Sequence, residues 1–239
     1  SIRLWGSVGF IAAVVLLGPL LDSHGTGLLP VVVLVLFVGI WFSSLTVPES
    51  AAGHLPLEQG PLSEVLGRPY VIALLAVCFL IQASHGPYYA FFTLYLEDYG
   101  YSRTLIGQLW GLGVVAEIAI FLFMSRLLPR YGARRLLLVA VGLTTIRWLL
   151  IALYASSLGA VLLAQTLHAA SFGVYHAVAI YLIHRLFTGA HQGRGQALYS
   201  SVSFGAGGAV GSLVSGYLWK GINPQAMFLL AAVASLLAL

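Results

Sequence analysis

Long apolar segments alternate with short polar ones along the whole chain. Eight segments have the hydropathy of membrane-spanning helices, which need about 20 residues. They cover residues 4–21, 28–45, 70–95, 104–127, 136–154, 158–187, 197–219 and 226–239. The last has only 14 residues. We therefore expect its helix to be truncated, because about 21 Å of helix does not cross a hydrocarbon core of ~30 Å. The pattern predicts an all-α integral membrane protein, a polytopic bundle with about eight transmembrane helices.

The longest polar stretch, residues 46–69, separates the apolar segments into two groups. It contains four prolines and several charged side chains, a composition typical of a linker. We therefore expect three parts: the last two helices of one bundle in residues 1–47, a linker in residues 48–69, and a six-helix bundle in residues 70–239.

Composition and charge placement agree with this interpretation and argue against a nucleic-acid partner. The chain is 60% hydrophobic and 8% charged, whereas a soluble domain carries about 25% charged residues. The net charge is +4, but the basic residues lie mostly in short loops between apolar segments. One set of alternate loops holds Arg3, Arg68, Arg126, Arg130, Arg134, Arg135, Arg185 and Arg194, and the other holds Arg103 and Lys220. This asymmetry places the first set, with the linker, in the cytoplasm.

Two local patterns predict how particular helices pack. His85-Gly86-Pro87 interrupts the segment 70–95, and a proline there removes a helix hydrogen bond, so we expect a kink or break. Gly207 and Gly211 form a G-x-x-x-G pattern in the segment 197–219, which predicts a face for close helix packing.

Candidate chemistry is concentrated in the segment 158–187. His168, Phe172, Tyr175 and His176 follow helical spacing, so two imidazoles and two aromatic rings are expected on roughly one face. Ionisable side chains at membrane depth usually face a cavity or a partner. The alternative is that both histidines are neutral, hydrogen-bonded core residues.

Two further charged residues lie inside predicted spans. Glu117 and Arg147 occupy consecutive segments, and each charge costs about 2.5–3.5 kcal/mol at a helix centre in lipid. We therefore expect both to look into a shared wet cleft, as a transport pathway requires. The alternative is a buried ion pair that only fixes helix register, although such a pair adds little net stability.

The loop at residues 124–135 resembles the signature of the major facilitator superfamily between the second and third helices of each half. Arg130, Gly132, Arg134 and Arg135 fit this pattern, whereas Pro129 stands at its usual acidic position. The resemblance implies a loop that acts in conformational change. A plain cytoplasmic arginine anchor is the alternative.

The resemblance extends over essentially the whole chain. H-G-P-Y-Y at 85–89, Q-T-L-H at 165–168 and F-G-V-Y-H at 172–176 resemble the phenylpropionic acid transporter family, near the proton-linked lactose and nucleoside permeases. This implies that the eight spans are helices five to twelve of a twelve-helix carrier in a bacterial cytoplasmic membrane. The first four helices would lie upstream of the sequence.

The family implies proton-coupled symport of a small organic anion such as 3-phenylpropionate, with no cofactor or metal. The candidate proton-coupling residues are Glu117, His168 and His176. The candidate substrate-binding residues are Arg147, which can hold a carboxylate with two hydrogen bonds, and His85, Tyr88, Tyr89, Phe172 and Tyr175. The chain departs from the lactose permeases in carrying Gln165 for a lysine and Ser171 for a glutamate, so their sugar specificity and proton route do not transfer.

Three alternatives remain open. A nucleoside or sugar permease is the alternative within the carriers. An intramembrane enzyme would need a motif such as H-E-x-x-H or G-x-S-x-G, and the sequence has neither. His168 and His176 are eight residues apart, so a metal site would need a ligand from another helix. A membrane scaffold without transport would leave Glu117 and Arg147 unexplained.

Overall fold

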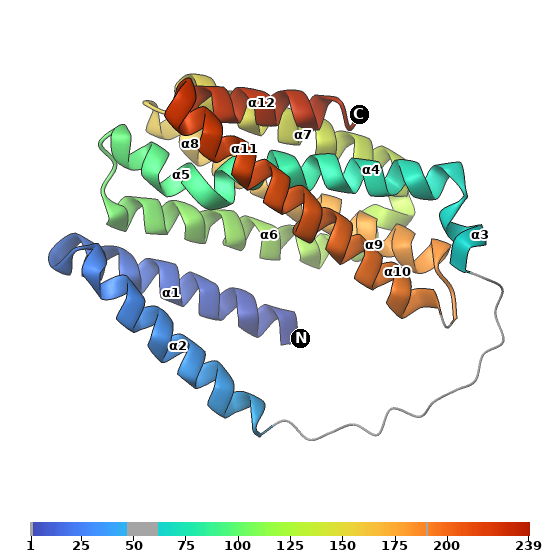
Figure 1. Cartoon of the computed structure of the whole chain (residues 1–239), viewed down its shortest axis with the longest axis horizontal. Helices are drawn as coiled ribbons and strands as arrows, with labels where there is room; N and C mark the ends of the chain where they lie inside the picture. The colour runs from blue at the N-terminus through green and yellow to red at the C-terminus, as the bar shows by residue number, and fades with distance from the viewer. Residues whose placement is uncertain (1, 47–61, 190) are drawn as a thin grey trace.

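The computed structural model describes residues 2–46, 62–189 and 191–239, and in these ranges all regular structure is helical. Figure 1 shows most of the helices running side by side between two ends of the molecule. In chain order they are α1 (Ile2–His24), η1 (Thr26–Leu28), α2 (Leu29–Ser44), α3 (Leu62–Leu66), α4 (Pro69–Ser84), α5 (Gly86–Asp98), α6 (Arg103–Tyr131), α7 (Ala133–Tyr154), α8 (Leu158–Thr166), η2 (Ala169–Val174), α9 (Tyr175–Leu186), α10 (His191–Ser200), η3 (Ser201–Gly207), α11 (Gly208–Gly221) and α12 (Pro224–Leu236).

The spans predicted from hydropathy are present. Within the described residues, six helical stretches are long and apolar enough to cross a membrane, and the shorter apolar helices Val8–His24 and Pro224–Leu236 match the first and last predicted spans. The prediction of an all-helical, multi-span fold is confirmed. The predicted linker lies mostly in residues 47–61, outside the described residues, and the division into two bundles stays a prediction.

The break predicted at His85-Gly86-Pro87 separates α4 from α5. His85 lies between the two helices, and Pro87 occupies the first turn of α5, where a missing N–H costs nothing. Gly86 touches the backbone of α11 at Gly211, where a Cβ atom could not fit. The break therefore lets two helix backbones meet.

The close-packing face predicted at Gly207 and Gly211 is confirmed. A Cβ atom on Gly207 would lie 2.7 Å from the carbonyl oxygen of Phe79, and one on Gly211 would overlap the backbone of Ala83. Both contacts join η3 and α11 to α4.

Two long helices contain a wider, π-helical turn that hydropathy did not predict. η2 joins α8 to α9, and η3 joins α10 to α11. Such turns are rare and often occur at functional sites. They change the direction of every side chain that follows along the helix.

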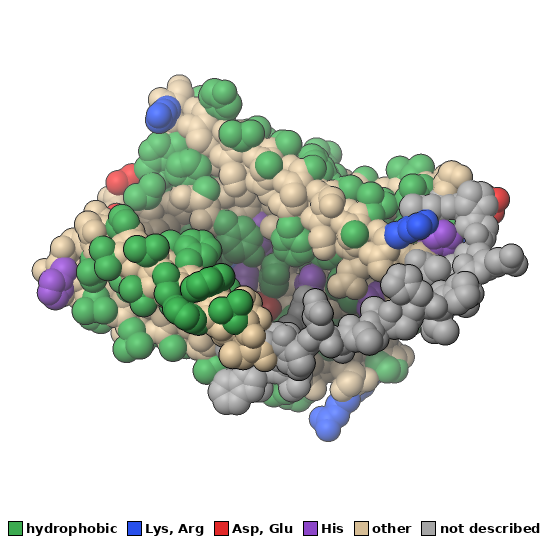
Figure 2. Space-filling model, turned by 60° about the horizontal axis from the view of Figure 1, so that its bottom comes forward, with side chains coloured by type: hydrophobic (Ala, Val, Ile, Leu, Met, Phe, Trp, Pro, Cys, Tyr) green, Lys and Arg blue, Asp and Glu red, His purple; other side chains and the backbone are tan. Residues whose placement is uncertain are grey.

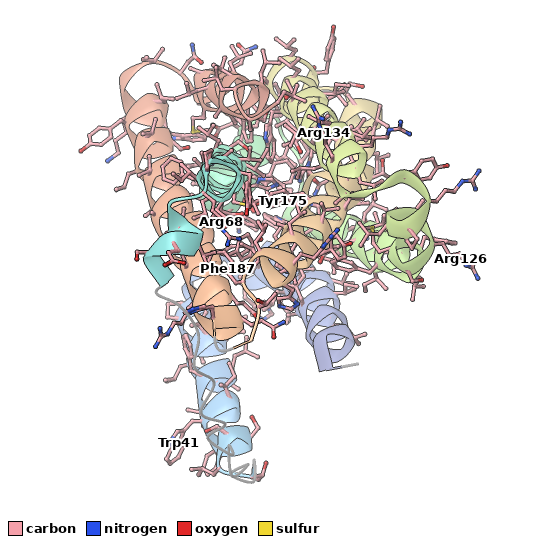
Figure 3. All side chains as sticks on the ribbon, turned by 90° about the vertical axis from the view of Figure 1, so that its right-hand side faces the viewer. Trp41, Arg68, Arg126, Arg134, Tyr175 and Phe187 are labelled. Atoms are coloured by element: carbon pink, nitrogen blue, oxygen red, sulfur yellow. The ribbon has the colours of Figure 1, made fainter. Side chains whose placement is uncertain are left out.

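The apolar helix α2 stands apart from the rest, as Figure 1 shows. None of its residues is buried, and Trp41, at its far end in Figure 3, is 59% exposed. An apolar surface of this extent is typical of a face covered by lipid or by other protein.

At one end of the molecule, the last turn of α1 is tied to the start of α6. Asp22 accepts hydrogen bonds from the backbone N–H of Arg103 (3.1 Å) and from the N–H and hydroxyl of Thr104 (2.9 and 2.5 Å). These N–H groups lie in the first turn of α6 and have no acceptor within the helix. A carboxylate at a helix N-terminus is also favourable electrostatically.

The same two helices approach closely along their length. A Cβ atom on Gly18 would lie 2.8 Å from the Cα of Thr104, and Gly107 packs against the carbonyl oxygen of Val14. Arg103 also donates to the carbonyl oxygen of Leu21 (3.1 Å) and to Glu97 (2.6 Å). Glycine contacts and the hydrogen bonds of Asp22 and Arg103 thus hold α1 against α6.

Removing the Asp22 carboxylate should loosen this end of the molecule. We expect Asp22→Ala to raise the hydrogen-exchange rates of the Arg103 and Thr104 amides, because both lose their acceptor. Asp98→Ala, which removes an exposed acid at the end of α5, is the matched control and should leave both rates unchanged. Equal rates in Asp22→Ala and the unsubstituted protein would contradict the contact.

The contact should also depend on pH in one direction. Hydrogen bonds from the Thr104 hydroxyl and amide lower the pKa of Asp22 from its ordinary value of 3.8. Because the pKa of Asp22 is lowered in the folded state, the contact is fully stabilising at pH values above the ordinary pKa. This stabilisation is lost as the pH falls through the lowered pKa. Protection of the two amides should therefore be equal at pH 7 and pH 5, and protection that disappears between those values would contradict this.

Candidate functional site

A cleft of about 930 Å³ opens between α1, α5, α6, η2, α9, α10 and η3. Figure 2 shows the hollow, with histidine side chains visible in it. Its lining combines aromatic rings with a few polar groups, and it includes no lysine or arginine among the described residues. The lining residues are Gly6, Phe10, Tyr89, Trp110, Val114, Glu117, Ile118, Phe121, Leu122, His168, Phe172, His176, Ile180, Gln196, Tyr199, Ser200 and Phe204.

Glu117 and His168 face each other on the wall of this cleft. Glu117 Oε2 lies 3.6 Å from His168 Nε2, and the two side chains are 14% and 6% exposed. The other ring nitrogen of His168, Nδ1, is buried and has no hydrogen-bond partner among the described residues. Gly113, one turn before Glu117 on α6, faces the imidazole, and a Cβ atom there would lie 3.5 Å from the ring, at ordinary van der Waals contact.

His168, Phe172 and His176 form a stack of three parallel rings. The ring centroids are 5.5 Å apart at each step, with interplanar angles of 4° and 5°. Four residues of α-helix overshoot a full turn by about 40°. The wider turn of η2 reduces that overshoot, so the three side chains lie one above another. His176 Nδ1 is 2.9 Å from the hydroxyl of Tyr199, and this hydrogen bond links the stack to α10.

Arg147 lies behind this stack and is fully buried. Its guanidinium donates to the carbonyl oxygen of Ala164 (3.0 Å), the hydroxyl of Ser171 (2.9 Å) and the side-chain oxygen of Gln165 (3.2 Å). Ala164 is in the last turn of α8, where carbonyl groups have no partner within the helix. Arg147 therefore satisfies the end of α8 and the start of η2 together.

Aromatic rings and a second layer of hydrogen bonds surround the guanidinium. Its carbon lies 4.2 Å from the ring centre of Tyr88 and 4.5 Å from that of Trp148, a geometry that favours a cation. Gln165 donates in turn to the hydroxyl of Tyr88 (3.2 Å) and to the carbonyl oxygen of Leu109 on α6 (2.9 Å). This network joins α5, α6, α7 and α8.

The prediction that Glu117 and Arg147 open on one cleft is wrong for Arg147. Glu117 lines the cleft, whereas Arg147 is separated from it by packed side chains. Tyr88, one of them, contacts both groups: its ring centre is 4.2 Å from the guanidinium carbon of Arg147 and 5.7 Å from that of the His168 ring. The reason is that α8 and η2 offer Arg147 enough neutral acceptors to keep the charge inside the protein.

The prediction that four side chains share one face of 158–187 is wrong for Tyr175. Figure 3 shows Tyr175 turned into the bundle, and its hydroxyl is 3.4 Å from the carbonyl oxygen of Cys78 on α4. Three residues turn an α-helix by only about 300°, so Tyr175 already diverges from Phe172, and its position after η2 changes its direction again.

The remaining predicted residues divide between the cleft and the core. Tyr89 lines the cleft and is 46% exposed. His85 and Tyr88 are buried and do not line it. His85 packs edge-on against Trp148 with ring centroids 4.9 Å apart, and its Nδ1 is 2.8 Å from the carbonyl oxygen of Ile81.

The predicted conformational loop is a tight turn at the other end of the molecule from Asp22. Gly132, with φ of 77°, joins α6 to α7, and its N–H donates to the carbonyl oxygen of Leu128 (3.0 Å). Arg130, Arg134 and Arg135 are exposed and form no ion pair with the described residues. Their role in conformational change stays a prediction.

Sequence reasoning missed several lining residues on other helices. Trp110, Tyr199 and Phe204 all face the cleft, and each packs against a predicted residue: Tyr88, His176 and Phe172 respectively. An aromatic residue in an apolar helix carries no mark of which way it faces. Only Tyr199 and Gln196 offered a hint, because both are polar and lie near the start of a span.

Comparison with known proteins agrees with this architecture. Residues 1–230 match the MFS_1 like family. The chain belongs to this family. It is thus a multi-pass member of a family of membrane transporters, and the prediction of a transporter family, not an enzyme family, is confirmed.

Two relatives and one solved structure illustrate the likeness. The chain is 31% identical over 239 residues to a probable 3-phenylpropionic acid transporter of Escherichia coli (strain K12), covering 98% of this chain and 62% of that protein. It is 29% identical over 251 residues to a maltose permease of Geobacillus stearothermophilus, covering 99% and 60%. It shares its fold with a crystal structure of the nucleoside transporter NupG, with a TM-score of 0.71, 17% identity and coverage of 99% and 65%. The chain thus spans less than two thirds of each of these proteins.

Replacing Arg147 should destabilise the protein even by a lysine. Arg147→Lys keeps a charge but cannot donate to Ala164, Gln165 and Ser171 at once, and each unpaired buried acceptor costs about 1–3 kcal/mol. We expect a clear fall in the thermal unfolding midpoint of the purified protein. Arg134→Lys, at an exposed position, is the matched control and should change stability by less than about 0.5 kcal/mol. An unchanged midpoint for Arg147→Lys would contradict the structural role.

Proposed function

We propose that this chain is the larger part of a proton-linked symporter for small aromatic carboxylates in a bacterial cytoplasmic membrane. The observation that carries the proposal is the Glu117–His168 pair on the wall of an aromatic-lined cleft. Ionisable groups at membrane depth that face a cavity are typical of proton and substrate pathways. The name of the relative from Escherichia coli supports a phenylpropionate-like substrate.

The charges of the cleft supply a reason for coupling. Glu117 is the acidic residue of the lining, and no arginine or lysine lines it within the described residues. A substrate carboxylate that enters while Glu117 is ionised meets a like charge in a region of low dielectric constant. Protonation of Glu117, or of His168 beside it, removes that repulsion. Substrate and proton are therefore expected to bind together and to leave together.

The two ends of the cleft support alternating access. The hydrogen bonds of Asp22 and the close contact of α1 with α6 lie at the end that holds Arg103. The lining residues Ile180 and Gln196 extend towards the end that holds Arg185 and Arg194. Arginine placement assigns that second end to the cytoplasm. We infer that this conformation is closed outside and open to the cytoplasm.

Gradient-driven uptake tests the coupling. In vesicles that contain the whole protein, an acidic exterior of one pH unit is worth about 1.4 kcal/mol per proton, enough for up to about tenfold accumulation of labelled 3-phenylpropionate. Glu117→Gln should abolish accumulation while leaving exchange of labelled for unlabelled substrate. Glu64→Gln, in α3 and away from the cleft, is the matched control and should behave as the unsubstituted protein. Uptake that ignores both the gradient and Glu117→Gln would overturn the assignment.

A neutral sugar or nucleoside is the second candidate substrate. The cleft wall presents an acid and aromatic rings but no arginine or lysine among its described residues, a combination that also suits hydroxyl-rich ligands. The names of the maltose permease and of NupG point the same way. Inhibition of phenylpropionate uptake by an excess of benzoate-type acids, but not by maltose or uridine, is the expected result. The reverse order would favour the second candidate.

A further inference from the structure

Both faces of the Phe172 ring are covered within the protein. His168 lies against one face and His176 against the other, each with its ring centre 5.5 Å away and nearly parallel. Phe172 nevertheless lines the cleft and is only half-buried. The part of the ring that reaches the cleft is therefore its edge.

The edge of an aromatic ring has a chemical preference of its own. It carries partial positive charge, whereas the face carries partial negative charge, so edges pair favourably with faces. Two imidazoles, which line the same cleft, stack on Phe172 and cover its faces. The wall at this point therefore presents the edge of Phe172, which favours the π face of a planar ring.

The neighbours of Phe172 hold the ring in this orientation. Phe204 approaches it at 64° with ring centroids 6.4 Å apart, and His85 at 65° and 6.5 Å. His176 is fixed in turn by its contact with Tyr199. Rotation of Phe172 about χ1 would break two stacked contacts at once, so the ring is held with its edge toward the cleft.

We propose that Phe172 selects the substrate ring, by presenting its edge to the π face of the ring of an aromatic carboxylate. This inference rests on the proposed function, and it adds a rule of specificity: planar aromatic rings are preferred to saturated rings of the same size. The rule runs against simple hydrophobicity, because a saturated six-membered ring is at least as apolar as a benzene ring and would bind as well in an unstructured apolar slot.

Competition between two matched acids tests this rule. 3-Phenylpropionate and 3-cyclohexylpropionate have the same carboxylate and the same linker and differ only in the ring. Each unlabelled acid is added to vesicles that contain the whole protein, and the concentration that halves the uptake of labelled 3-phenylpropionate is measured. This concentration should be about two- to tenfold higher for the cyclohexyl acid than for the phenyl acid, the range expected for an edge-to-face contact.

Substitutions assign the preference to one residue. Phe172→Leu should bring the ratio of the two half-inhibiting concentrations, cyclohexyl acid to phenyl acid, to about one. Phe172→Tyr, which keeps the ring, should preserve this ratio. Phe91→Leu is the matched control, because Phe91 is also half-buried but packs on Trp219 and does not line the cleft. Stabilisation of the purified variants against heat by each acid gives the same ratio where Phe172→Leu transports too slowly to measure.

The outcomes separate the two proposals. Discrimination that survives in Phe172→Leu, or that is absent from the unsubstituted protein while phenylpropionate is still transported, overturns the role of Phe172 and leaves the proposed function standing. An unsubstituted protein that neither transports 3-phenylpropionate nor is stabilised by it overturns the proposed function, and the ring rule with it.

Discussion

The buried guanidinium of Arg147 sets the arrangement of the helices around the cleft. A charge inside an apolar bundle is tolerated only where hydrogen bonds replace its water. Here the acceptors come from the end of α8 and the start of η2, and the flanking rings come from α5 and α7. Gln165 extends the network to α6. If one of these elements shifts, an acceptor is lost, so a single side chain fixes the positions of several helices at once.

The partners of Arg147 are neutral side chains. Gln165 and Ser171 both accept hydrogen bonds from the guanidinium. A lysine at 165 would place a second positive charge against Arg147. The buried network and the ionisable cleft are therefore separate: Arg147 organises the core, and Glu117 with His168 provides the titratable groups that meet the cleft.

Interruptions of the helices place the polar and aromatic side chains on the cleft wall. The wide turn η2 aligns the imidazoles of His168 and His176 on Phe172, and the break at His85 lets α5 carry Tyr89 to the same space. A glycine permits the close contact beside the break at His85, at Gly86 with α11. At the end of the molecule that holds Arg103, the exposed hydrogen bonds of Asp22 hold α1 to α6, and water can replace Asp22 as the acceptor of these hydrogen bonds. Regular helices thus provide the frame, and their interruptions provide the site.

The sequence by itself determined the spans, the break at 85–87, the packing face at Gly207 and Gly211, and the presence of charge at membrane depth. Each of these depends on local chemistry: apolar runs match a bilayer, proline cannot donate, and glycine admits a neighbouring backbone. Only the tertiary structure decided that Arg147 is enclosed, that Tyr175 points at α4, and that Tyr199 meets His176. The direction of a side chain around a helix depends on residues far away in the chain and on where a turn widens, and a hydropathy pattern contains neither.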